Sequence, residues 1–191
     1  TSSCTSKKAS RTEGSHEAEQ DLTMIVGTYT SGDSKGLYSF RFNEENGTAT
    51  ALSEAEVENP SYLVPSADGK FIYAVSEFSN EQAAANAFAF NKEEGTFRLL
   101  NTQKTGGEDP CYIITNGSNV VTANYSGGSI SVFPIDKDGS LLPASEVVKF
   151  KGSGADKERQ EKPHLHCVRI TPDGKYLFCL LYTSDAADDL T

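Results

Sequence analysis

The sequence predicts an all-β fold, a β-propeller, and three observations lead to that fold class. Short strands with alternating apolar side chains recur along the chain, tight-turn motifs separate them at a nearly fixed interval, and no helical periodicity lies between them. One unit of 44 to 53 residues therefore holds four short strands joined by hairpins, which is the size of a propeller blade. A β-sandwich also has regularly spaced strands, but it does not repeat one order of motifs three times.

The first repeated motif is a tight turn that follows an alternating strand. The turns are Asn46-Gly47-Thr48, Glu94-Gly95-Thr96 and Asp138-Gly139-Ser140, which lie 48 and 44 residues apart. Each turn comes soon after an aromatic-rich run, such as Ala87 to Phe90. Because glycine after a polar residue suits a hairpin turn, each motif is predicted to form a strand, a hairpin and a second strand.

Two further motifs recur with the same period. A second turn precedes an apolar strand at Asp68-Gly69 and again 105 residues later at Asp173-Gly174, with Asn116-Gly117 about midway. A proline-led motif opens each unit, at Pro60-Ser61-Tyr62, Pro110-Cys111-Tyr112 and Pro163-His164-Leu165-His166. The order of the three motifs is the same in each unit, which indicates one supersecondary structure repeated in series.

The number of units predicts an open arc. The first strand, Met24 to Tyr29, aligns with the second strand of later units, such as Phe71 to Val75, so the first blade is predicted to lack its innermost strand. The chain then holds about three to three and a half blades, whereas closed propellers have typically four to eight. We therefore expect an N-terminal fragment of a larger propeller.

The two ends of the chain differ from the repeat. Residues 1–21 are rich in Ser and Thr and almost without apolar side chains, which predicts a disordered leader. Cys4 follows small residues and precedes this polar tether, as at the processed end of a bacterial lipoprotein. Two interpretations stay open, a lipid anchor at Cys4 or a chance cysteine in a flexible tail. Residues 180–191 break the strand pattern and are interpreted as a non-native tail.

The composition excludes several classes of function. A net charge of -10 disfavours binding to the phosphate backbone of nucleic acids. The longest apolar runs are far shorter than the roughly 20 residues of a membrane span, so none is expected. The four cysteines form no close pair, which predicts neither a metal site nor a disulfide framework. The chain has no tryptophan, so the Trp-Asp signature of WD40 blades is absent.

Loops that leave one end of every blade are the expected place for chemistry. The loop after the second strand and the approach to the inner strand emerge on the same face, and His164 and His166 lie at such an approach. Alternation along an inner strand points both side chains toward the central channel, where they could exchange protons near neutral pH. The alternative is that they fill a polar channel. A metal site is not expected, because a third ligand is missing nearby.

Two other segments on that face offer binding groups. The loop from Lys151 to Lys162 is dense in charge and contains Arg159, whose planar guanidinium could clamp a carboxylate or a phosphate. A solvated surface charge is the alternative for Arg159. The segment Asn124 to Gly128 offers an amide, a phenol and backbone N–H groups that suit a sugar-like ligand, and a plain β-turn is the alternative there.

These motifs resemble the seven-bladed lactonase propellers, a family that includes bacterial propeller-type 6-phosphogluconolactonases and fungal carboxymuconate lactonising enzymes. The most specific segments are Asn124-Tyr125-Ser126-Gly127-Gly128 and Pro163-His164-Leu165-His166. The similarity runs from about residue 24 to 179, so residues 22–179 are expected to form a partial lactonase propeller. Members of the family continue after the strand at Tyr176 to Phe178 with Asp-Leu-Gly, and this chain does not.

The resemblance implies hydrolysis of a sugar δ-lactone, 6-phosphogluconolactone above all, at the channel mouth without a metal or cofactor. It implies catalytic roles for His166 and His164, and substrate binding by Arg159, Gln160, Asn124 and Tyr125, with further site residues supplied by later blades. Two alternatives stay open: a lactonising cycloisomerase that acts on an unsaturated dicarboxylate, and a non-catalytic envelope-associated binding propeller. The location stays open between the bacterial cytoplasm and, if Cys4 is lipidated, the envelope.

Overall fold

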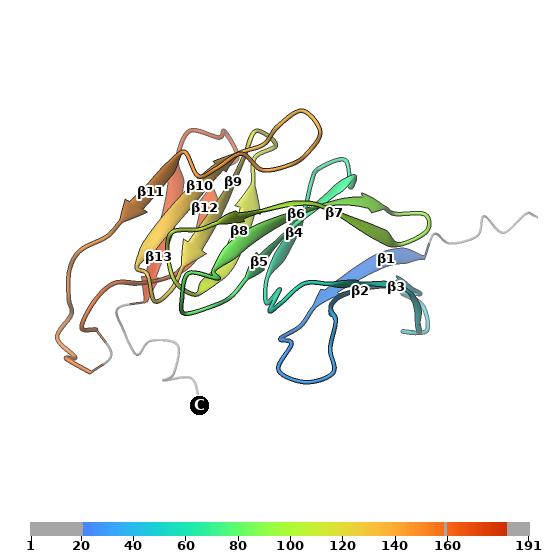
Figure 1. Ribbon diagram of the computed structural model, residues 1–191, viewed down its shortest axis with the longest axis horizontal. Helices are drawn as coiled ribbons and strands as arrows, with labels where there is room; N and C mark the ends of the chain where they lie inside the picture. Colours follow the sequence, from blue (N-terminus) through green and yellow to red (C-terminus); the bar gives the residue numbers. More distant parts are fainter. Residues whose placement is uncertain (1–20, 159, 183–191) are drawn as a thin grey trace, which may run out of the picture.

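The computed structural model describes residues 21–158 and 160–182, which form 13 β-strands and no helix. Every neighbouring pair of strands within a sheet is antiparallel. The strands group into four sheets, here called blades I to IV, that follow one another along the chain (Figure 1). The all-β repeat predicted from the turn motifs is confirmed.

The four blades differ in their number of strands. Blade I has three, namely β1 (Leu22–Gly27), β2 (Gly36–Phe42) and β3 (Ala49–Glu56). Blade II has β4 (Leu63–Pro65), β5 (Phe71–Ser76), β6 (Ala84–Asn91) and β7 (Thr96–Lys104). Blade III has β8 (Pro110–Thr115), β9 (Asn119–Asn124), β10 (Ser129–Pro134) and β11 (Glu146–Lys149). Blade IV has β12 (His164–Ile170) and β13 (Leu177–Tyr182).

This strand count agrees with the predicted number of blades. In blades II and III the chain runs from one edge of the sheet to the other, so β4 and β8 are the first strands of their sheets. Blade I starts one strand later, because β1 pairs with β2 in the way that β5 pairs with β6. The described residues therefore hold two complete blades, a first blade without its innermost strand and the opening of a fourth.

Turns with glycine at positive φ join the strands, as the sequence motifs predicted. Gly47, Gly95 and Gly139 have φ angles of 71°, 71° and 87°. Gly139 also lies against the neighbouring blade, because a Cβ atom there would come within 2.1 Å of Cε1 of Phe71. A side chain at this turn would push blades II and III apart, so the glycine is required by packing as well as by backbone conformation.

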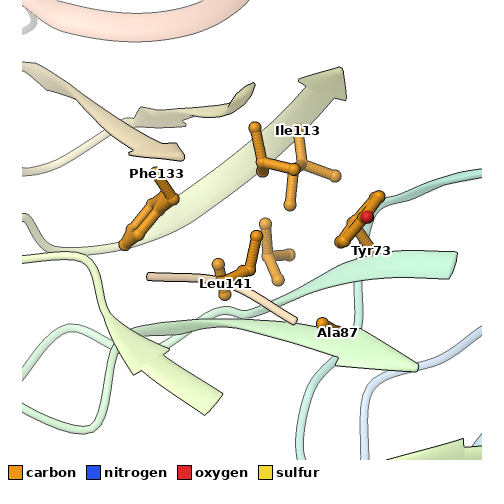
Figure 2. Packing of buried hydrophobic residues seen from close by; sticks show 8 residues of the cluster. Tyr73, Ala87, Ile113, Phe133 and Leu141 are labelled. Atoms are coloured by element: carbon orange, nitrogen blue, oxygen red, sulfur yellow. The ribbon is translucent and has the colours of Figure 1, made fainter. Parts of the chain in front are cut away.

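The blades pack face to face, and the middle strands β5 and β9 bury both of their faces. Ile72 on β5 packs in a cluster with Leu37 of blade I. Tyr73, the next residue, points the other way and packs with Ile113 and Phe133 of blade III (Figure 2). Because successive side chains of a strand point to opposite faces, β5 serves two cores at once. Full burial of each large apolar side chain contributes about 1.5 to 3 kcal/mol.

Polar contacts fix the register between neighbouring blades. The Tyr73 hydroxyl donates to the carbonyl oxygen of Gly139 at 3.1 Å, and the Ser39 hydroxyl donates to the carbonyl oxygen of Gly95 at 2.6 Å. In both cases a strand of one blade bonds a hairpin turn of the next blade. The hairpin turns therefore satisfy their buried carbonyl groups and hold the stack in one position.

One boundary differs from the expected one. The strand β13 runs to Tyr182, three residues beyond the predicted end of the propeller segment at 179, since Leu180 to Tyr182 pair with the start of β12. Residues 183–191 and the predicted leader up to residue 20, including Cys4, lie outside the described residues, so the leader, the anchor and the rest of the tail stay predictions. Within the described residues, no helix has the length and apolarity needed to cross a membrane.

Replacing Tyr73 by Phe is expected to lower the free energy of unfolding by about 1 to 3 kcal/mol, because the Gly139 carbonyl would be left buried without its donor. Denaturant melts at pH 8 check this loss. Burial, helped by the Asp68 and Asp138 carboxylates, raises the pKa of Tyr73 to about 12.

The contribution of Tyr73 to the free energy of unfolding is thus complete below the ordinary tyrosine pKa of about 10, and it is lost as the pH rises toward 12. The Tyr73→Phe variant should lack this part of the alkaline loss of stability. A matched control is Tyr176→Phe, at a side chain that is 65% exposed. Equal stability of Tyr73→Phe and the parent protein at pH 8 would contradict the account.

Candidate active site at one end of the blades

Polar side chains from several blades gather at the end where the inner strands begin and where the second strands finish. The members come from the residues just after β1, β5 and β9, from the segment that leads into β4, and from the first residues of β8 and β12. This group is here called the mouth cluster, and it consists of Tyr29, Ser61, Glu77, Cys111, Tyr125, His164 and His166.

Two β-bulges shape this end of the inner strands. In β8 the pairing steps from Pro110 to Tyr112, and in β12 it steps from Leu165 to Cys167. Cys111 and His166 are therefore equivalent extra residues, and a bulge turns such a side chain away from the regular alternation. The repeated proline-led motif predicted that Pro163 in blade IV is equivalent to Pro110 in blade III. The positions of the two bulges show instead that Leu165 is equivalent to Pro110.

The two histidines meet on the ring of Tyr125. The ring centroids of Tyr125 and His164 are 4.7 Å apart with the planes tilted by 31°. Those of Tyr125 and His166 are 5.9 Å apart in an edge-on arrangement. The two imidazoles thus lie on one aromatic ring, with His166 at the bulge of β12.

The His164 imidazole is oriented by a carboxylate. Its Nε2 lies 3.1 Å from Oε1 of Glu161, and the side chain is only 13% exposed. With Nε2–H donating to Glu161, Nδ1 is left as an acceptor, and this buried atom has no hydrogen-bond partner among the described residues. His166 is exposed, so of the two rings it is the one that bulk water reaches.

Tyr125 is placed by the turn that follows it. Gly128 has a φ of 55°, and a Cβ atom there would lie 2.6 Å from the carbonyl oxygen of Pro163. Only glycine permits this close approach of the turn to the segment that leads into β12. The glycines predicted to expose backbone N–H groups to a ligand therefore have a second effect, since they bring Tyr125 onto the histidines.

Asn124 does not reach the mouth cluster. Its side chain is fully buried, and its Nδ2 donates to Ser129 Oγ at 3.0 Å and to Ser131 Oγ at 2.9 Å. Its Oδ1 accepts from Thr122 Oγ1 at 3.0 Å. The prediction that Asn124 contacts substrate is corrected by this placement: its amide connects β9 to β10 inside blade III and can act on a ligand only by positioning Tyr125.

Gln160 holds the charged loop together. Its Oε1 accepts from the backbone N–H of Asp156 at 3.1 Å, and its carbonyl oxygen accepts from the N–H of Gly154 at 2.8 Å. These bonds close a compact turn before β12, so the side-chain oxygen is engaged in the loop itself. Arg159 lies outside the described residues, and its predicted contact with substrate stays a prediction.

Tyr29, Ser61 and Glu77 are members of the mouth cluster that were not predicted from the sequence. The Tyr29 hydroxyl donates to Oε2 of Glu77 at 3.0 Å, and the Ser61 hydroxyl donates to the same oxygen. Burial and the neighbouring Glu77 carboxylate raise the pKa of Tyr29. The signal that could have found them is the repeat itself, because Glu77 follows β5 just as Tyr125 follows β9.

Cys111 is not suited to nucleophilic attack. Burial, followed by the charge of Glu77, raises the pKa of Cys111 to about 12. The thiol is therefore protonated at neutral pH, and the thiolate is the reactive form. Within the part of the chain that the structure describes, no three His, Cys, Asp or Glu side chains lie close enough together to hold a metal ion.

A family model matches most of the chain. Residues 23–185 match the model described as "Lactonase, 7-bladed beta-propeller". The 6-phosphogluconolactonase of Bacillus subtilis is 37% identical over 158 residues, which are 80% of this chain and 44% of that protein. The chain thus spans less than half the length of this relative.

Solved structures of proteins described as lactonases also match this chain. A Bacteroides fragilis protein, whose assignment as a 6-phosphogluconolactonase is provisional, matches with a TM-score of 0.85 and 70% identity over 88% of this chain and 48% of its own. The periplasmic gluconolactonase of Pseudomonas aeruginosa matches with a TM-score of 0.78 and 30% identity over 86% of this chain and 48% of its own.

Asn124→Ala is expected to lower the free energy of unfolding by about 2 to 3 kcal/mol, because buried hydroxyl groups lose their partner. Chemical denaturation measures the change. Asn119→Ala, at the other and partly exposed end of β9, is the matched control and should lose much less. A stability of Asn124→Ala equal to that of this control would show that the amide is not the centre of the blade III network.

Proposed function

Since the chain belongs to the lactonase family of seven-bladed β-propellers, we propose that the whole protein hydrolyses a sugar δ-lactone, with 6-phosphogluconolactone as the preferred substrate. The observation that carries the proposal is the convergence of His164 and His166 on Tyr125 at the start of β12. A solvent-accessible imidazole beside a second, carboxylate-oriented one suits proton transfer to and from water at neutral pH.

In the proposed reaction His166 acts as the general base. It takes a proton from a water molecule while the water oxygen adds to the lactone carbonyl carbon. The tetrahedral intermediate then collapses, the ring C–O bond breaks, and the ring oxygen leaves as a hydroxyl after taking the proton from His166. The product acid ionises and releases one proton to solvent, so one water is consumed and one proton appears for each lactone opened.

His164 and Tyr125 have positioning roles in this proposal. Glu161 holds Nε2 of His164 at 3.1 Å, and the Tyr125 ring packs against both imidazoles. A general base works only when its nitrogen is held within hydrogen-bond distance of the reacting water. The Nδ1 of His164 is buried, so this ring acts on the reaction by its position beside Tyr125 and not by direct contact through that nitrogen.

The preference for a phosphorylated substrate rests on the loop before β12. This loop carries Lys151, Lys157, Arg159 and Lys162, and also Asp156, Glu158 and Glu161, in a chain whose net charge is -10. We propose that its cationic side chains, Arg159 above all, bind the phosphate of 6-phosphogluconolactone. The Bacillus subtilis relative is named for the phosphorylated lactone and the Pseudomonas aeruginosa one for the unphosphorylated lactone, so the loop is proposed to decide between them.

His166→Ala in the whole protein is expected to lower turnover of 6-phosphogluconolactone by about 100-fold or more, the usual contribution of a general base. Acid release in a pH-stat, corrected for spontaneous opening of the lactone, measures the rate. The matched control is His16→Ala, which removes the histidine of the N-terminal segment and should leave the rate unchanged. Unchanged turnover in His166→Ala would remove the general-base role. No acceleration by the unmutated protein would remove the proposed function.

A further inference from the structure

Glu77 offers a carboxylate at the mouth cluster that the proposed reaction does not use. It follows the last residue of β5, its side chain is partly exposed, and its Oε2 accepts hydrogen bonds from the hydroxyls of Tyr29 and Ser61. Its other oxygen, Oε1, accepts no hydrogen bond from residues 21–158 or 160–182. A carboxylate can accept several hydrogen bonds on each oxygen, so Glu77 has capacity left for a ligand.

The repeat places Glu77 at the same position in blade II as Tyr125 in blade III. The backbone N–H of Glu77 donates to the carbonyl of Asn59 at 3.1 Å, and that of Tyr125 donates to the carbonyl of Asp109 at 2.8 Å. Asn59 and Asp109 are the only residues other than glycine with positive φ among those described, at 46° and 51°. Because Tyr125 contacts both histidines, its equivalent one blade earlier belongs to the same end of the channel.

Cys111 connects the two halves of the mouth cluster. Its Sγ lies 3.5 Å from the carbonyl oxygen of His166, which makes it a neighbour of the proposed general base. On its other side it is close enough to Glu77 for that carboxylate to help raise the pKa of the thiol. Glu77 and His166 therefore flank the same residue, at adjacent places around the channel mouth.

The junction of blades I and II does not depend on the Glu77 carboxylate alone. Asn59 joins blades I and II, since its Oδ1 accepts from the backbone N–H of Thr30 at 3.0 Å and from the Thr30 hydroxyl at 3.1 Å. Its Nδ2 donates to the backbone carbonyl of Glu77 at 3.3 Å. The Glu77 carboxylate adds a contact to Tyr29 at this junction through Oε2 only, and its Oε1 stays available to a ligand.

We propose that Glu77, oriented by Tyr29 and Ser61, binds ring hydroxyl groups of the sugar lactone and makes the site selective for polyhydroxylated lactones over plain ones. This inference rests on the proposed function. A carboxylate is a strong acceptor for hydroxyl groups and repels a phosphate. It would therefore turn the phosphorylated end of the substrate away from Glu77, toward the lysines and Arg159 of residues 151–162, and present the carbonyl to His166.

The test compares two six-membered lactones with the whole protein. Glucono-δ-lactone carries ring hydroxyls and δ-valerolactone carries none. Glu77→Gln keeps the shape of the side chain but removes the charge, and a hydrogen bond to a charged group is worth about a tenfold to 100-fold change in binding. KM for glucono-δ-lactone should therefore rise by about 10 to 100-fold with little change in kcat, as for lost uniform binding. The kcat/KM for δ-valerolactone should stay within about twofold.

Controls separate this role from folding and from the chemical step. Glu81→Gln removes an exposed carboxylate of the same blade and should change KM and kcat for neither lactone. Tyr29→Phe keeps the charge, removes only one orienting hydroxyl and should give a smaller rise in the same KM. If δ-valerolactone is opened too slowly to measure, the rise in KM against constant kcat for glucono-δ-lactone carries the test.

An equal loss of kcat/KM for both lactones in Glu77→Gln would overturn the hydroxyl-binding role. A fall in kcat without a rise in KM, or no change in the kinetics for either lactone, would overturn it as well. If Glu77→Gln does not fold, an unchanged KM in Tyr29→Phe and in Ser61→Ala would overturn it instead. The proposed function fails separately, since in that case the unmutated protein would accelerate the opening of neither glucono-δ-lactone nor 6-phosphogluconolactone.

Discussion

Burial of both faces of the middle strands β5 and β9 is the constraint on which the rest of the structure depends. Tyr73 and Ile72 are adjacent on β5, yet they belong to the cores on opposite sides of blade II. On β9, Val120 and Val121 are divided in the same way between blades II and IV. A sheet buried on both sides cannot rotate or slide against its neighbours without opening a cavity, so the blades are held in one register.

The fixed register explains how residues far apart in the sequence form one site. Every second strand ends, and every inner strand begins, at the same end of the stack. Glu77 and Tyr125 are 48 positions apart but occupy equivalent places. The bulges at Cys111 and His166 then turn one side chain of each inner strand out of the regular pattern. Rigid packing supplies the frame, and the local irregularities supply the chemistry.

Much of this fold could be predicted from the sequence, because its signals are local. A glycine after Asn or Asp specifies a turn from two residues alone, and Gly47, Gly117 and Gly174 all lie at positive φ as expected. The β-bulges were not predictable, since a bulge is defined by the strand opposite. For Asn124, the same polar residue at a strand end suits a ligand contact or an internal network, and only the packing of blade III decides between them.

The proposals assign the two parts of the substrate to different blades. Glu77 lies between blades I and II, where it bonds Tyr29 and Ser61, whereas the loop of residues 151–162 leads into blade IV and carries four cationic and three acidic residues. In the proposed orientation the ring hydroxyls lie at Glu77 and the phosphate lies at this loop. The histidine pair on Tyr125 then lies between the two binding regions, where the carbonyl carbon would be attacked.

The most direct measurement is a crystal structure of the whole protein with 6-phosphogluconate, the product of the proposed reaction. The account predicts the new carboxylate beside His166, the hydroxyls toward Glu77 and the phosphate against the loop that precedes β12. Product bound instead at the opposite end of the blades, in the cavity lined by Asp68 and Lys137, would contradict it, as would a reversed orientation with the phosphate toward Glu77.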